Sequence, residues 1–123
     1  MYLNCHSFHS LRYGTIPLPD LIQQAVASNV KAMALTDINT VTGIYDFIKG
    51  CNEVGIKPLV GMEFRYNNQL RYIGLAKNAE GLAEMNRFLT KHNFENTTLP
   101  LEAPDFKEVF LIYPFENVPA VLK

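Results

Sequence analysis

Short apolar runs alternate with amphipathic stretches along most of the chain. Continuous apolar runs bounded by polar residues predict strands, and apolar residues recurring every three or four positions predict helices. Pro17 to Asp20 suit the first turn of a helix, and Gly55 suits the position just after a helix end. The pattern predicts strands over 2–6, 31–36, 57–64, 70–76 and 108–113, and helices over 17–29, 44–54 and 78–92.

The order of these elements indicates an α/β fold. Strands and helices alternate through the first 64 residues, which favours parallel strands joined by right-handed crossovers. A polar stretch from Arg65 to Gln69 then predicts a hairpin, and 93–106 is a polar connection that contains proline. With 123 residues, the chain is expected to form one domain over 1–123, with mostly parallel strands and flanking helices.

Composition narrows the classes of function. The formal net charge is −1, which gives no electrostatic reason for direct binding to DNA or to a membrane surface. No apolar run approaches the roughly 20 residues of a membrane span, and the first residues do not resemble a signal peptide. Cys5 and Cys51 are therefore expected to be reduced, buried side chains in a cytoplasmic protein.

Three polar residues follow or end predicted strands, where the reactive edge of a parallel sheet lies. His6, Asp37 and Glu63 would converge there as a divalent-metal or phosphate site. Each has a simpler interpretation: His6 as a packed, hydrogen-bonded histidine, Asp37 as a helix cap, and Glu63 as a solvated charge. His9 and His92 are expected on the surface or in loops.

Four segments together resemble a known family. They are LNCHSFHSLRYG from Leu3, ALTDIN from Ala34, GIKPLVGMEF from Gly55 and LAKNAEG from Leu75. In order and spacing they are similar to the PHP (polymerase and histidinol phosphatase) domain, and more narrowly to the N-terminal region of bacterial DNA polymerase III alpha subunits. The resemblance implies a distorted α/β barrel with more strands than this chain supplies, so we expect a partial PHP-type (βα) barrel.

The departures from the family pattern concern its metal ligands. Asn4 and Ile38 stand where metal-binding members have histidine, and Tyr13 stands where an acidic residue is common. Asparagine is a poor transition-metal ligand and isoleucine is none. The resemblance therefore implies a vestigial site of His6, Asp37 and Glu63, which would take Zn²⁺ or Mn²⁺ if it took any metal, and no catalytic residue in this chain.

The resemblance implies a role in DNA replication. The chain would be the N-terminal portion of the PHP domain of a DNA-directed DNA polymerase, a nucleotidyltransferase that uses Mg²⁺, and would itself be structural or regulatory. Its partners would be the polymerase body and the proofreading subunit, with DNA reached only through the longer chain. A stand-alone metal-dependent phosphoesterase is the alternative, and an α/β interaction module is a third. An incomplete barrel also exposes apolar surface, which predicts a homodimer, unless helices cover both faces of an open sheet.

Overall fold

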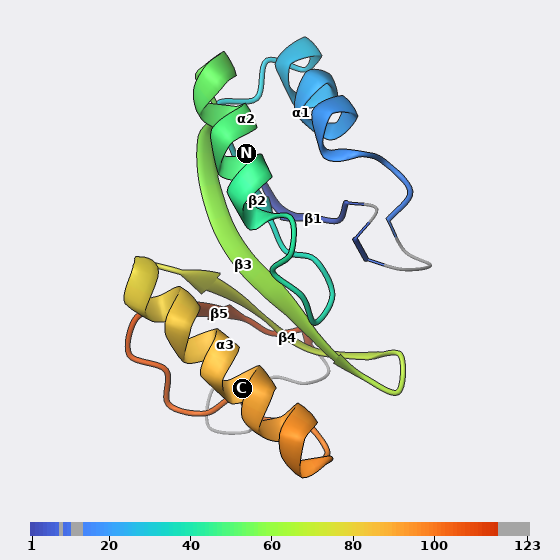
Figure 1. Cartoon of the computed structure of the whole chain (residues 1–123), viewed down its shortest axis with the longest axis vertical. Helices are drawn as coiled ribbons and strands as arrows, with labels where there is room; N and C mark the ends of the chain where they lie inside the picture. The colour runs from blue at the N-terminus through green and yellow to red at the C-terminus, as the bar shows by residue number, and fades with distance from the viewer. Residues whose placement is uncertain (8, 11–13, 116–123) are drawn as a thin grey trace.

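The computed structural model describes residues 1–7, 9–10 and 14–115 (Figure 1). Five strands and three helices alternate along this part of the chain. They are β1 (Tyr2–Cys5), α1 (Leu18–Ala27), β2 (Ala32–Leu35), α2 (Ile44–Val54), β3 (Lys57–Tyr66), β4 (Gln69–Ala76), α3 (Ala79–Glu95) and β5 (Val109–Ile112). Every predicted element is present, and the fold class is confirmed as mixed α/β.

The strands form one sheet in chain order, β1-β2-β3-β4-β5. The first two ladders are parallel and the last two are antiparallel, one more antiparallel pair than the predicted hairpin alone would give. The additional pair arises because the connection after α3 returns to the start of that helix. There Lys77 N donates to Glu108 O at 2.9 Å, so β5 begins beside the end of β4 and runs the opposite way.

The long strand β3 joins the two kinds of ladder. Its first half, 57–60, pairs with β2, and its second half, 61–66, pairs with β4. In Figure 1, β3 runs along most of the length of the molecule, with α1 and α2 beside its first half and α3 beside its second half. The sequence predicted that this strand ends at residue 64, and the structure extends it to Tyr66.

Local sequence accounts for the helix ends. Gly55 ends α2 with φ at 78°, a left-handed conformation that costs glycine little. Asn78 caps α3 because its side chain accepts a hydrogen bond from Gly81 N at 3.0 Å. Helix α3 continues past the predicted end at 92 and stops at Asn96, where φ is 53°.

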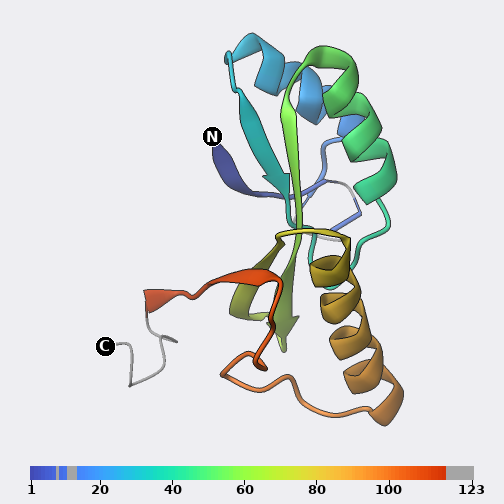
Figure 2. The same ribbon diagram turned by 90° about the vertical axis from the view of Figure 1, so that its left-hand side faces the viewer.

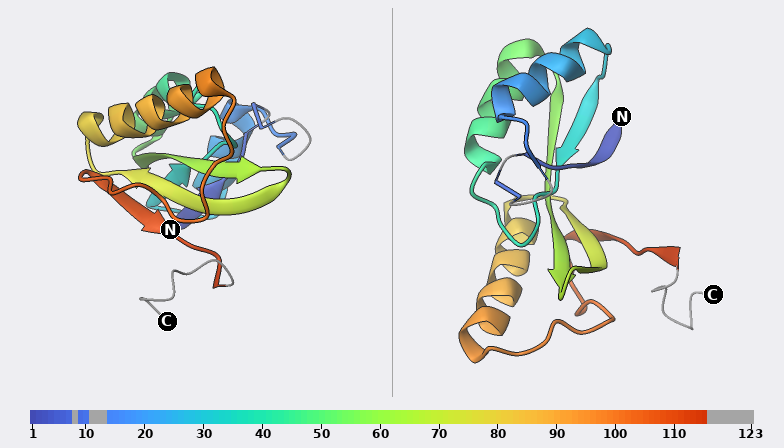
Figure 3. Two further views of the ribbon diagram at one scale, coloured as in Figure 1. Left: turned by 90° about the horizontal axis from the view of Figure 1, so that it is seen from below. Right: turned by 90° about the vertical axis from the view of Figure 1, so that its right-hand side faces the viewer.

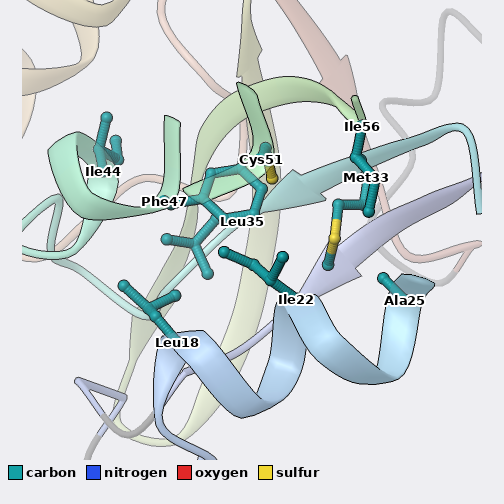
Figure 4. Packing of buried hydrophobic residues seen from close by; sticks show 9 residues of the cluster. All are labelled: Leu18, Ile22, Ala25, Met33, Leu35, Ile44, Phe47, Cys51 and Ile56. Carbon is teal, nitrogen blue, oxygen red and sulfur yellow. The ribbon is translucent and has the colours of Figure 1, made fainter. Parts of the chain in front are cut away.

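Two apolar clusters lie along β3. The first packs α1 and α2 against β2, with Phe47, Cys51 and Met33 at most 1% exposed (Figure 4). The second packs α3 and the connection before β5 against β3 and β4, around Phe64 and Tyr72. Val60, Met62 and Phe64 alternate along β3 and all face these clusters, so the three helices cover one face of the sheet (Figures 2 and 3). None of the described helices is long and apolar enough to cross a membrane.

Hydrogen bonds from the segment that precedes β5 to Glu84 join that segment to α3. The Glu84 carboxylate accepts hydrogen bonds from Lys107 N at 3.0 Å and from Glu108 N at 2.9 Å. These two backbone bonds hold the pKa of Glu84 below its ordinary value. A carboxyl group with a lowered folded pKa stabilises the fold above its unfolded pKa, and that contribution is lost as the pH falls through the folded pKa.

We predict that Glu84→Gln lowers the free energy of unfolding near neutral pH, and that the gap to the wild type narrows as the pH falls below the ordinary glutamate value of 4.5. Urea unfolding at a series of pH values measures the gap. Glu102→Gln, a change at an exposed glutamate in the same connection, is the control and is expected to leave the curve unchanged. A gap that stays constant with pH would contradict this account.

The helix-free face carries apolar side chains at the end of the sheet formed by β5. Leu75 and Phe110 pair across β4 and β5 with their side chains on this face, and Phe110 is 61% exposed. The expected homodimer stays a prediction, in which copies cover this face or pair their edge strands. Sedimentation at micromolar concentration should give twice the 13.9 kDa chain mass. A monomer that unfolds cooperatively would show that the exposed face needs no partner.

Candidate functional site

The polar centre of the fold lies where β3 changes its pairing from parallel to antiparallel. Glu63 N donates to Asp37 O at 3.1 Å, and Asn39 N donates to Glu63 O at 3.0 Å. Ile38 therefore forms an isolated parallel bridge with Glu63 just beyond the end of β2. The prediction that Glu63 ends the third strand was wrong, since β3 continues for three residues through its ladder with β4.

The Glu63 carboxylate is buried and surrounded by polar side chains. Only 1% of Glu63 is exposed, so the interpretation as a solvated charge was also wrong. Arg65 Nε donates to Glu63 Oε2 at 2.7 Å, and His6 Nε2 lies 3.2 Å from the same oxygen. Asn4 Nδ2 donates a long hydrogen bond of 3.5 Å to Oε1. Residues from β1, the segment after β1 and β3 thus meet at one carboxyl group.

The two basic side chains set the ionisation of Glu63. Burial raises the pKa of this carboxyl group, but the contacts with His6 and Arg65 lower it by more, so the net pKa lies below the ordinary value. An arginine side chain stays protonated at any pH at which proteins fold. Glu63 is therefore ionised at neutral pH, with its charge balanced from within the chain.

Asp37 lies 2% exposed in a separate cluster made with the segment after β1. Its Oδ1 accepts from Ser7 N and Ser10 Oγ, and its Oδ2 accepts from Ser7 Oγ, each at 2.7 Å. Ser10 Oγ in turn accepts from Ile38 N at 2.9 Å. Asp37 does not cap the following helix, because α2 begins at Ile44 with no side-chain cap. It instead holds Ser7 and Ser10 against the end of β2.

Asn39 and Thr36 complete the polar centre. Asn39 pairs with the backbone of Arg65 through both atoms of its amide, with Arg65 N donating to Oδ1 at 3.0 Å and Nδ2 donating to Arg65 O at 2.9 Å. Thr36 Oγ1 donates to Asn4 Oδ1 at 2.6 Å. The two bonds of Asn39 fix the strand segment that carries Glu63 and Arg65, and the bond of Thr36 ties β1 to the end of β2.

Sequence reasoning missed Arg65, Asn39, Ser7 and Ser10. The alternation of Met62, Phe64 and Tyr66 with Glu63 and Arg65 was a signal that β3 continues and that both charged residues share a face. Ser7 and Ser10 lie within the first segment that resembles the family, but nothing in that segment showed that they bind Asp37. Tyr13 lies outside the described residues. His9 lies in a turn and His92 lies near the end of α3, both half-buried.

The described residues do not fit a metal centre. His6 and Glu63 are brought together, but Asp37 is directed to the serines, and the described part of the chain contains no group of three or more histidine, cysteine or acidic side chains suited to holding a metal ion. Every Asp37 oxygen already accepts a hydrogen bond, and Arg65 is bonded to Glu63. A metal site needs deprotonated ligands whose lone pairs are available.

Fold and polar centre together define a member of an α/β barrel-like class. The profile of the PHP domain matches residues 3–116, and the chain belongs to the PHP domain family. DNA polymerase III subunit alpha of Staphylococcus aureus (strain Mu50 / ATCC 700699) is 31% identical over 95% of this chain. The error-prone DNA polymerase of Symbiobacterium thermophilum is 36% identical over 73% of the chain. The chain spans 11% and 8% of the lengths of these two relatives.

Solved structures share the fold. A putative metal-dependent phosphoesterase from Bifidobacterium adolescentis has a TM-score of 0.59 at 17% identity, over 76% of this chain and 33% of the other. An amidohydrolase from Chromobacterium violaceum has a TM-score of 0.56 at 23% identity, over 76% and 34% of the two chains. At these identities the likeness concerns the barrel-like fold alone, and the predicted partial PHP-type barrel is confirmed.

We predict that Asp37→Asn lowers the free energy of unfolding by about 2 kcal/mol, because a buried carboxylate that accepts three hydrogen bonds is replaced by a group with one acceptor oxygen. Urea unfolding measures the loss, and hydrogen exchange should show faster exchange at Ser7 N. The exposed Asp105→Asn serves as the control, with a change within about 0.5 kcal/mol. Equal stability of the two variants would contradict the assigned role of Asp37.

Proposed function

We propose that this chain is the N-terminal PHP module of a DNA polymerase III alpha-type polymerase. In this proposal its polar centre has a structural role, which is to hold the strands and loops of the module together. The alignment with the staphylococcal polymerase subunit over 95% of the chain supports the polymerase context. The pairing of Arg65 with the buried Glu63 is the observation that carries the structural role. In this proposal the module itself performs no catalysis.

The chemistry of the centre supports this role. A catalytic metal site must leave a coordination position open for water or substrate. Here the Glu63 carboxylate is bonded to Asn4 of β1 and Arg65 of β3, and the Asp37 carboxylate is bonded to Ser7 and Ser10. These bonds hold the edge strand β1 and the loops at the end of β2 in place, which is a structural role.

In this proposal DNA synthesis belongs to the rest of the polymerase. The polymerase body would carry out nucleotidyl transfer during DNA replication with Mg²⁺, and DNA would reach the module only through that body. The near-neutral charge of −1 agrees with a module that does not hold DNA itself. The polymerase body and the proofreading subunit are the proposed protein partners, in the cytoplasm.

A stand-alone metal-dependent phosphoesterase is the second candidate. One observation favours it: His6 Nε2 is buried, makes no hydrogen bond to a described residue, and faces the Glu63 carboxylate at 3.2 Å. A histidine and a glutamate at this spacing are a pair that zinc sites use. The pairing of Arg65 with the same carboxylate oxygen weighs against this candidate.

We predict that the chain can replace the aligned N-terminal segment of the staphylococcal polymerase subunit. The chimera should extend a DNA primer within about tenfold of the native enzyme, a difference of about 1.4 kcal/mol, because the module supplies a fold and no reacting group. A polymerase that lacks the segment is the control for its structural contribution. An inactive chimera would contradict the polymerase context.

The isolated chain separates the two candidates. With Zn²⁺ or Mn²⁺ it should not hydrolyse p-nitrophenyl phosphate above the rate of a Glu63→Gln variant. Hydrolysis by the wild type that Glu63→Gln abolishes would establish the phosphoesterase instead.

A further inference from the structure

The buried centre around Glu63 contains a cation that the sequence itself supplies. We propose that the Arg65 guanidinium takes the place and the charge of a divalent metal ion at Glu63, so that this arginine excludes metal from the centre. The inference rests on the proposed structural role of the module, and it names the residue responsible.

The buried charge of Glu63 would be costly without a partner. An ionised carboxylate that is 1% exposed needs a compensating positive charge, since desolvation of an unpaired ion costs several kcal/mol. Among the described side chains, the bond from Arg65 Nε to Glu63 Oε2 is the shortest contact to that carboxylate, at 2.7 Å. The arginine therefore supplies the charge that a bound cation would otherwise supply.

The Arg65 side chain is held in place beside Glu63. Glu63 and Arg65 lie two residues apart on β3, and Asn39 holds the Arg65 backbone by two hydrogen bonds. The Arg65 side chain is 21% exposed, so most of its length is packed rather than solvated. A side chain held in this way loses little conformational entropy when its Nε–H donates to the carboxylate.

Arg65 and a metal ion would compete for the same oxygen of Glu63. Glu63 Oε2 is the atom that both Arg65 and His6 approach. A metal ion held by Glu63 and His6 would have to lie beside that oxygen, next to the guanidinium. Repulsion between the two cations is strong at such distances in a poorly solvated site. Metal binding therefore requires that Arg65 withdraw.

The test is the metal affinity of Arg65→Met, which keeps an unbranched apolar side chain and removes the charge. Titration with Zn²⁺ by calorimetry should show binding at least tenfold tighter than to the wild type, and Zn²⁺ should raise the Tm of the variant but not that of the wild type. Arg65→Lys, which keeps a positive charge, should bind Zn²⁺ no better than the wild type. Arg87→Met, a change at an exposed arginine paired with Glu80 on α3, is the control for loss of an arginine elsewhere.

A second substitution locates the gained site. Adding His6→Ala to Arg65→Met should abolish the tighter binding, because His6 is the nitrogen ligand beside Glu63. If Arg65→Met unfolds without metal, recovery of the fold on adding Zn²⁺ supports the proposal, and failure to recover contradicts it.

Equal Zn²⁺ affinity of Arg65→Met and the wild type would overturn the inference, as would tight binding that survives His6→Ala. These results would leave the proposed polymerase role standing, because that role is tested by primer extension in the chimera.

Discussion

The buried carboxylate of Glu63 in the middle of β3 is the constraint on which the rest of the structure depends. Its backbone is bonded to Asp37 and Asn39 beyond the end of β2, and its side chain contacts Asn4 of β1 and His6 just after β1. The same residue marks where parallel pairing of β3 gives way to antiparallel pairing. A charge at this position must be balanced, and the contact with Arg65 balances it without any group from outside the chain.

The pattern of apolar residues predicted the helices and strands because apolar runs and helical spacing are both clear in this sequence. The bounds of α2 agree at both ends with the prediction, and its end is marked by Gly55 in a left-handed conformation that glycine adopts readily. The end of α3 was predicted too early because the stop is Asn96, a residue that also occurs within helices. The continuation of β3 was missed because Glu63 and Arg65 interrupt the apolar run, although strict alternation in a strand covered on one face produces that pattern.

The candidate site could be predicted only in part. Strand order placed His6 and Glu63 near one another, and the structure brings them to 3.2 Å. The sequence could not show that Asp37 faces the other way, because nothing in the segment that contains Ser7 and Ser10 showed that they bind it. Nor did it show that the charge beside Glu63 comes from its own strand. A resemblance transfers ligand positions, but the partners of those ligands depend on packing that the motif does not contain.

The most direct test of this account is to observe the Arg65 Nε–H proton by NMR while Mn²⁺ is added to the isolated chain. The account predicts a slowly exchanging signal, because the proton is held in a 2.7 Å bond to a carboxylate that is 1% exposed. It also predicts that a stoichiometric amount of Mn²⁺ leaves the signal unbroadened. Rapid exchange of this proton with water, or its selective broadening by Mn²⁺ together with His6, would contradict the claim that Arg65 closes the centre.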